Sequence, residues 1–222
     1  SNERLIFQMK DRNNFPNGGL YAVNCDGSKH IVLNPSHKTN REFGGLVFKV
    51  VGLFDPLTDE GGDILVEVRK GSGSFREERA FYGNIVRLNT LTAKEKRVVF
   101  NRGDILQFIA DRDNVVRIGG AQHGLIRSII HRRDAKSDWE EIYSADFRTA
   151  MEPLGFGTNP DILYVAALNG DKRALFQYDL KAKKLGRMIF THPVYDVPSG
   201  PPIVSDKTGK VLGVRYEAER PQ

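Results

Sequence analysis

The sequence predicts an all-β protein, a partial β-propeller ring of about four to five blades with four strands each. Two observations carry this prediction. Short apolar or alternating segments bounded by turn residues run through almost the whole chain, and no convincing helical periodicity interrupts them. A segment of apolar residues closed by Asn or Asp also recurs, and Asn89, Asp134 and Asp179 follow one another at intervals of 45 residues. A strand-type repeat of about 40–50 residues is typical of propeller blades.

The expected strands fall into five repeats. The first holds residues 5–9, 19–24 and 29–33, where Asp26-Gly27 supplies the positive φ angles of a tight hairpin turn. The second opens with an apolar run suited to an interior strand, and its strands are 46–54, 64–69, 83–89 and 96–100. The third repeat has strands at 104–110, 115–119, 125–132 and 140–144, and the fourth at 151–155, 162–167, 174–180 and 186–190. The fifth is expected at 201–205 and 210–216. Its closing marker would fall about 45 residues after Asp179, beyond Gln222, so a ring truncated within its last blade is expected over residues 1–222.

Two polar excursions interrupt the second repeat. Residues 55–63 are expected to form a loop, and residues 70–82 an insertion that lengthens the interval from Asn24 to Asn89. They are the longest excursions of the chain, so they are the expected contacts of a propeller rim with a partner domain or a substrate, with plain surface loops as the alternative. The candidate rim residues are Asp59, Glu60, Arg76, Glu77, Glu78 and Arg79.

The composition is that of a soluble globular domain, with 27% charged residues, 40% hydrophobic residues and a net charge of +5. No apolar run reaches the length of about 18–20 residues that crosses a bilayer, and the single Cys25 excludes an internal disulfide. Basic clusters at 131–133 and 181–184 are expected at solvated strand ends and turns. Because no basic stripe with stacking aromatics is visible, neither nucleic acid nor a membrane is an expected partner. The compartment stays open between cytoplasm and periplasm.

Catalytic and metal-binding signatures are not expected. A serine hydrolase needs a Gly-x-Ser-x-Gly elbow, and the nearest string, residues 71–75, has its glycines out of phase. The five histidines form no His-x-x-x-His pair and no Cys–His cluster. Residues 111–114 start like a calcium loop but continue with Val115, and Gly119-Gly120 precedes no helix that could bind phosphate. We therefore expect no catalytic residue, no metal and no cofactor in this chain.

Several hairpins resemble those of one peptidase family. The segments concerned are 83–89 with 96–99, 109–118, 174–180, 190–197 and 203–216. Their order and spacing are similar to blade elements of the prolyl oligopeptidase-like serine peptidases of the dipeptidyl- or acylaminoacyl-peptidase type. The likeness covers most of residues 83–216 and departs from the family at Thr92-Ala93, where a Thr-Gly turn is usual. It implies an N-terminal propeller that caps a C-terminal α/β-hydrolase domain of the same polypeptide and admits only short peptides.

Two main functions follow as alternatives. The first is a non-catalytic propeller that gates a serine peptidase acting on short peptides, with the hydrolase domain and the peptide substrate as its partners. The second is a stand-alone propeller, similar to TolB or to WD-repeat proteins, that binds protein partners. A third hypothesis, a propeller enzyme with its site on the central axis, would recruit carboxylates such as Glu67, Asp104 and Asp196. An incomplete ring would expose apolar sheet faces and strand edges, so self-association is also expected.

Overall fold

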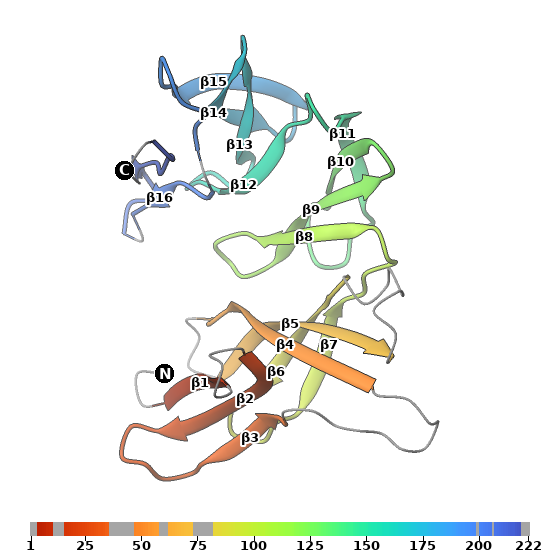
Figure 1. The fold of residues 1–222 in the computed structure, drawn as a ribbon, viewed down its shortest axis with the longest axis vertical. Coiled ribbons are helices and arrows are strands. Elements are labelled where there is room, and N and C mark those ends of the chain that lie inside the picture. The colour runs from red at the N-terminus through yellow and green to blue at the C-terminus, as the bar shows by residue number, and fades with distance from the viewer. Residues whose placement is uncertain are drawn as a thin grey trace. The chain divides into compact units, whose positions relative to one another are not determined.

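The computed structural model describes residues 4–10, 16–35, 47–57, 62–72, 82–198, 200–205 and 207–218. These residues form strands joined by turns, and no helix occurs among them. The chain divides into two compact units, Ser1–Gly103 and Asp104–Gln222. Each unit is built from antiparallel sheets whose strands are consecutive in sequence (Figure 1). The predicted all-β fold with four-stranded, blade-like sheets is confirmed.

The first unit contains two sheets. One has three strands in the order β1 (Arg4–Lys10), β2 (Pro16–Asn24) and β3 (Ile31–Asn34). The other has four strands in the order β4 (Val47–Asp55), β5 (Asp63–Ser72), β6 (Asn84–Asn89) and β7 (Glu95–Val99). Side chains of alternating residues on β2 and β3 pack against β4, β5 and β6, because successive residues of a strand point to opposite faces. The buried members of this core are Leu20, Ala22, Leu33, Val51, Ile64, Val66, Val68, Val86 and Leu88.

The second unit contains two complete sheets and a short one. The strands of the first complete sheet are β8 (Ile105–Ala110), β9 (Val116–His123), β10 (Ile126–His131) and β11 (Glu140–Asp146). Those of the second are β12 (Glu152–Phe156), β13 (Ile162–Asn169), β14 (Lys172–Asp179) and β15 (Lys184–Phe190). The pair β16 (Ile203–Val204) and β17 (Val211–Gly213) forms the third sheet.

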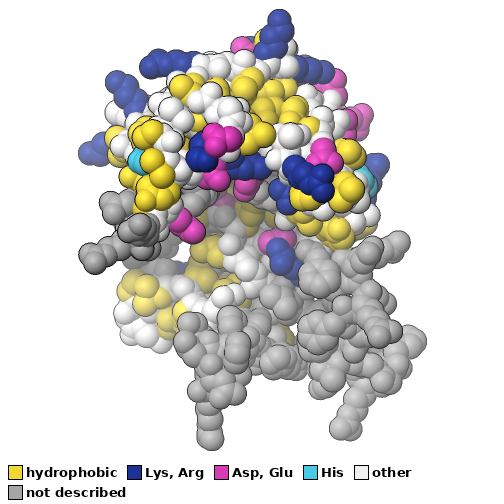
Figure 2. Space-filling view, turned by 45° about the horizontal axis from the view of Figure 1, so that its top comes forward, with side chains coloured by type: hydrophobic (Ala, Val, Ile, Leu, Met, Phe, Trp, Pro, Cys, Tyr) yellow, Lys and Arg dark blue, Asp and Glu magenta, His cyan; other side chains and the backbone are white. Residues whose placement is uncertain are grey.

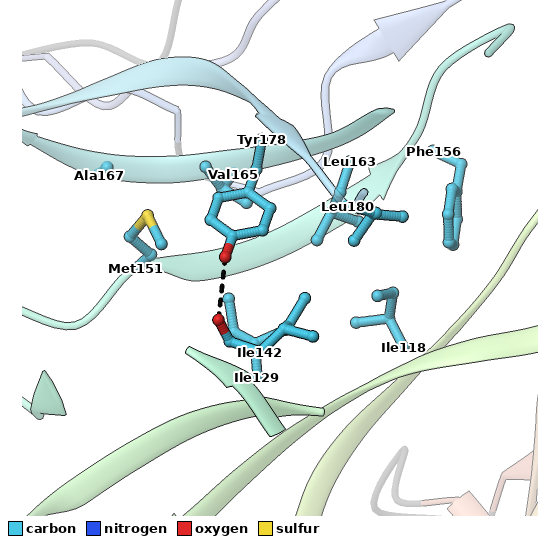
Figure 3. Packing of buried hydrophobic residues seen from close by; sticks show 10 residues of the cluster. All are labelled: Ile118, Ile129, Ile142, Met151, Phe156, Leu163, Val165, Ala167, Tyr178 and Leu180. Atoms are coloured by element: carbon cyan, nitrogen blue, oxygen red, sulfur yellow. Dashed lines mark hydrogen bonds between the residues drawn. The ribbon is translucent and has the colours of Figure 1, made fainter. Parts of the chain in front are cut away.

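The main core of the second unit lies between its two complete sheets (Figure 3). Ile118 and Ile129 project from β9 and β10 toward Leu163 and Val165 of β13, and all four side chains are fully buried. The opposite face of the β12–β15 sheet is also apolar, since Tyr164, Ala166 and Leu175 pack there with Val211 and Val214. A sheet with two apolar faces must be covered on both sides, which is the packing of a propeller blade.

The recurring Asn or Asp has the same structural role in three sheets. Asn89 ends β6, Asp134 follows β10, and Asp179 ends β14. In each case the side-chain Oδ1 accepts hydrogen bonds from the backbone N–H groups two and three residues later, at 2.8 to 3.1 Å. These bonds also hold the pKa of the Asp134 carboxyl near 2. The repeat marker is therefore the cap of the turn between the third and fourth strand of a sheet.

The earliest marker, Asn24, differs in its partners. It ends β2, and its Oδ1 accepts a hydrogen bond from Nη1 of Arg4 at 2.6 Å while its Nδ2 donates to Oγ of Ser28 at 3.0 Å. By position β2 is nevertheless the counterpart of β6, β10 and β14. The described strands β1, β2 and β3 thus correspond to the second, third and fourth strands of the complete sheets.

The strand boundaries differ from the prediction at several strand ends; for example, β9 continues to His123 past the predicted end at residue 119, and β2 already begins at Pro16. β5 continues to Ser72 and pairs with β4 up to Val47, so residues 70–72 of the expected insertion belong to the sheet. The last two strands are shorter than predicted: β16 comprises Ile203–Val204 and β17 comprises Val211–Gly213. Of the expected loop at 55–63, Asp55 ends β4 and Asp63 begins β5. Residues 58–61 and 73–81 of the two excursions lie outside the described ranges.

Candidate functional site

The rim residues proposed from the sequence cannot be placed. Asp59, Glu60, Arg76, Glu77, Glu78 and Arg79 all lie outside the described residues, so their role stays a prediction. Within the described ranges, no three His, Cys, Asp or Glu side chains are grouped as a metal site would require. The same ranges offer no helix with the length and apolar character needed to span a membrane. Cys25 is exposed.

A cleft lies in the second unit, where β8, β9 and β10 face the start of β12. Its volume is about 180 Å³. Leu106, Met151 and Pro153 supply apolar walls, and Arg127 and Glu152 supply charge. Leu106 is 46% exposed, so an apolar side chain stands at the open rim. The cleft therefore combines a small apolar interior with one cationic and one anionic wall.

Two successive glycines of β9 have different neighbours, and only Gly120 lines the cleft. A Cβ on Gly119 would lie 2.8 Å from Cγ1 of Ile130, on the neighbouring strand β10, and 3.2 Å from Cγ2 of Ile105. A Cβ on Gly120 would meet Cγ of Pro153 at 3.6 Å and Cβ of Gln107 at 3.9 Å, which are ordinary contacts. Glycine in a strand interior marks the close approach of another element. In the structure, Gly119 allows the close approach of Ile130 and Ile105, and Gly120 leaves space beside Pro153 of β12.

The strand edges that flank the cleft are poorly suited to pairing with another strand. β8 and β12 are edge strands of their sheets. The register of β8 against β9 skips Leu106, which is the extra residue of a β-bulge, and the register of β12 against β13 skips Leu154. Pro153 of β12 also lacks a backbone N–H. Bulges and proline block edge-to-edge pairing, so a ligand would engage the cleft through side chains.

The cationic wall of the cleft is held in place by its neighbours. Arg127 is half-buried, and its Nε donates to Oε1 of Gln122 at 3.1 Å. The amide of Gln122 is oriented in turn, because its Nε2 donates to the backbone O of Gly124 at 3.0 Å. Glu152 is exposed on β12, and no ion pair joins it to Arg127 among the described residues. The two charges therefore line the cleft without neutralising each other by contact.

A second polar cluster occupies the opposite ends of β9 and β10. Arg117 is 6% exposed, and its Nη1 donates to the backbone O of Pro160 at 2.9 Å and lies 3.4 Å from Oδ2 of Asp111. Its guanidinium carbon lies 5.2 Å from the ring centroid of Phe156. Pro160 and Phe156 belong to the next sheet, so Arg117 fastens the two complete sheets of the second unit together.

Arg132 is buried beside this cluster, contrary to the expectation of a solvated turn at residues 131–133. It is 6% exposed, its Nε donates to the backbone O of Val116 at 2.7 Å, and its guanidinium carbon lies 4.8 Å from the ring centroid of Trp139. Burial lowers the pKa of Arg132, and the charge of Asp134 opposes this shift without cancelling it. Of the three residues, only Arg133 is fully exposed.

His131 connects the two arginines and is half-buried. Its Nε2 lies 3.2 Å from Nη2 of Arg117, and because a guanidinium can only donate, the imidazole nitrogen accepts. Burial, followed by the charge of Arg117, lowers the pKa of His131, with a smaller contribution in the same direction from Lys183. Glu140 and Asp161 act in the opposite direction without prevailing. This end of the sheet is thus built around a neutral histidine.

The charged side chains of described residues visible in Figure 2 do not gather into one dominant patch. On the face shown in Figure 2, the coloured Lys and Arg side chains are dispersed among acidic and hydrophobic ones. This distribution is unlike the continuous basic stripe of a nucleic-acid surface. A second cleft, of about 340 Å³, lies on the β5–β7 part of the first unit. The cleft beside β12 has the more apolar lining and is therefore the candidate site.

Comparison with known proteins supports the fold and goes no further. No protein-family model and no curated protein matches the chain. Among solved structures, the chain is similar to TolB from Acinetobacter baumannii, with a TM-score of 0.50 and 12% sequence identity over 87% of its length. The match covers 43% of the TolB chain, so this chain spans less than half the length of that protein. The likeness shows a TolB-like β-propeller fold, while the resemblance to serine peptidases rests on the sequence motifs alone.

Proposed function

We propose that this chain is a non-catalytic propeller module that binds a peptide or an exposed protein segment through the cleft between β8, β9, β10 and β12. The observation that carries the proposal is an open, apolar cleft with one cationic and one anionic side chain on its walls. Apolar surface with a few placed polar groups is typical of binding sites.

The size of the cleft favours a peptide over a small molecule. Sites for small molecules have volumes of roughly 300–1,000 Å³, whereas this cleft holds about 180 Å³. That space accommodates one amino-acid side chain together with the backbone that carries it. A segment anchored by one side chain in a central pocket is also the usual form of an interface hot spot.

The strand edges specify how such a segment would bind. Leu106 bulges from β8, and Pro153 on β12 offers no N–H. Strand addition, which needs a regular free edge, is therefore disfavoured on both sides of the cleft. We expect a ligand that inserts a side chain past the exposed rim at Leu106.

The test begins with a phage-displayed library of random linear peptides selected on the immobilised full chain. Selected peptides are resynthesised, and their dissociation constants are measured by isothermal titration calorimetry with the wild-type protein and with Leu106→Asp. A charge at the rim should weaken binding by about tenfold or more, since an apolar contact near a hot spot is replaced by a solvated carboxylate.

The matched control is Leu91→Asp. Leu91 is 50% exposed, similar to Leu106, and lies in a turn of the first unit rather than at the cleft. This variant should bind the peptides as the wild type does. Peptides that bind both variants equally well, or a selection that yields no binder, would refute the proposed site.

A second candidate function is the cap of a serine peptidase. It is supported by the order of hairpin motifs over residues 83–216, which resembles the propeller of prolyl oligopeptidase-like enzymes. The test is an assay with dipeptidyl and acyl-aminoacyl chromogenic substrates on this chain and on the product of the longest reading frame that contains it. Cleavage only by a longer protein with a hydrolase domain supports the cap. A reading frame without such a domain refutes the cap function. Turnover by this chain alone would contradict the expectation, drawn from the missing nucleophile elbow, that the chain has no catalytic residue.

A further inference from the structure

We infer that Arg127 binds a carboxylate of the ligand, so that the cleft recognises an apolar side chain with a carboxylate next to it. The inference rests on the proposed peptide-binding function and narrows its ligand class. Two sources could supply the carboxylate: the C-terminus of a peptide, or an Asp or Glu side chain within a segment.

The geometry of Arg127 leaves the two terminal nitrogens of its guanidinium, Nη1 and Nη2, available to a ligand. Only Nε has a hydrogen-bond partner, Oε1 of Gln122, and among the described residues neither Nη1 nor Nη2 has one. The same residues include no Asp or Glu in ion-pair contact with Arg127. A guanidinium fixed through one nitrogen presents its remaining donors in a defined plane, which suits the two oxygens of a carboxylate.

Gln122 is the residue that positions the Arg127 guanidinium. Its Oε1 accepts from Arg127, and its Nε2 donates to the backbone O of Gly124 in the β9–β10 turn. The register pairs Gln122 directly with Arg127 across the two strands, so the side chains share one face of the sheet. An arginine held in this way loses less conformational freedom when it binds a ligand.

The charge of Glu152 influences which way round a ligand binds in the cleft. It lies on the cleft wall contributed by β12, opposite the β10 wall that carries Arg127. A ligand carboxylate is attracted by Arg127 and repelled by Glu152, so it must sit at the β10 side while the apolar group fills the space beside Pro153. The charge pattern thus fixes the orientation of the bound segment.

The test uses three short probes that share one leucine: acetyl-Ala-Leu with a free carboxylate, acetyl-Ala-Leu-amide, and acetyl-Leu-Asp-amide. Each is titrated into the isotope-labelled full chain, and the backbone amide shifts of Gly120 and Ala121 report occupancy of the cleft by NMR. Whichever of the two charged probes binds more tightly shows whether the cleft recognises a C-terminal carboxylate or an Asp or Glu side chain. It should bind about 10- to 100-fold more tightly than the amide probe, which is the gain expected of a charge-assisted hydrogen bond.

Variants assign the gain to Arg127. Arg127→Gln should remove the advantage of the charged probe and leave the amide probe unchanged, and Gln122→Ala should reduce it in part. Glu152→Gln should tighten the charged probe only, because it removes a repelling charge. Arg187→Gln, at an exposed arginine of β15, serves as the control and should behave as wild type.

The outcomes separate this inference from the proposed function. Equal affinity for all three probes, with shifts confined to the cleft, would overturn the carboxylate inference and leave an apolar peptide site in place. A charged-probe advantage that survives Arg127→Gln would also overturn it. No shift at Gly120 and Ala121 with any probe would overturn both proposals.

Discussion

Tyr178 makes a hydrogen bond between two sheets whose loss can be measured. Its side chain is 2% exposed, and its Oη donates to the backbone O of Ile142 at 2.9 Å (Figure 3). Ile142 needs this donor because the register of β10 with β11 pairs Ile129 with Tyr143 and Ile130 with Glu141, which leaves Ile142 as the extra residue of a bulge. Residues at a bulge lose ladder bonds, and the Tyr178 hydroxyl from β14 replaces one.

The substitution Tyr178→Phe removes only this hydroxyl. The ring stays in the core, so the loss of apolar burial is small, and the main effect is a buried carbonyl left without a donor. Such a group costs about 1–3 kcal/mol. For a domain of this size, each kcal/mol shifts the melting temperature by about 4 °C, so we expect a decrease of about 4–12 °C.

The measurements are thermal unfolding, which gives the melting temperature, and urea unfolding, which gives the free energy, both followed by tryptophan fluorescence. Trp139 is the single tryptophan of the chain and lies in the second unit, so its emission reports that unit. The matched control is Tyr164→Phe, a tyrosine on the adjacent strand that is 6% exposed and whose hydroxyl has no hydrogen-bond partner among the described residues. The control should change the free energy of unfolding by less than about 0.5 kcal/mol. Equal effects of the two substitutions would refute the account of the bulge.

Two further predictions concern the same unit. Burial and the charge of Arg117 lower the pKa of His131 below its usual 6.5. As the pH falls below 6.5, the unfolded chain therefore takes up a proton that the folded chain does not, and the unit should lose stability. The variant His131→Gln should flatten this pH dependence when unfolding is followed through Trp139 at a series of pH values, and an unchanged slope would contradict the prediction. Gly119→Ala should destabilise the second unit by about 1–3 kcal/mol, because the added Cβ overpacks against Ile130. Gly120→Ala should stay near wild type in the same assay, because its added Cβ makes an ordinary contact at 3.6 Å. Similar melting curves for the two variants would show that the spacing of β9 and β10 is not tight.

The repeats were predictable because their cause is local. A side-chain oxygen of Asn89, Asp134 or Asp179 caps the turn that follows it. This cap needs only a short polar side chain and the backbone N–H groups of the residues two and three positions later in the sequence. Strand alternation is equally local, so the sequence indicated the order of the strands and their grouping into sheets. Their ends were less predictable, as in β5, because Ser72 pairs with Val47 across the sheet.

The candidate site was missed because it depends on contacts between sheets. Nothing near Arg127 in the sequence distinguishes it from other exposed arginines, and its partner Gln122 becomes adjacent only through the β9–β10 register. The one available signal was Gly119-Gly120, since paired glycines in a strand indicate close approach of another element. The burial of Arg132 was not predicted for a different reason: it comes from Trp139 and from the carbonyls of Val116 and Ala135 within the same sheet and its β10–β11 loop, which no sequence pattern specifies.

Two arginines on neighbouring strands differ in how many of their hydrogen-bond donors the described residues take up. Arg117 is buried, and the next sheet and Asp111 take up its donors, so it has nothing left to offer a ligand. Arg127, at the other end of the same strand pair, is half-buried and held by Gln122 through Nε alone. Leu106 and Glu152 line the same cleft, and among the described residues no ion pair engages Glu152. The terminal nitrogens of Arg127 thus stay accessible at an open cleft, and this accessibility is what the proposed recognition of a carboxylate requires.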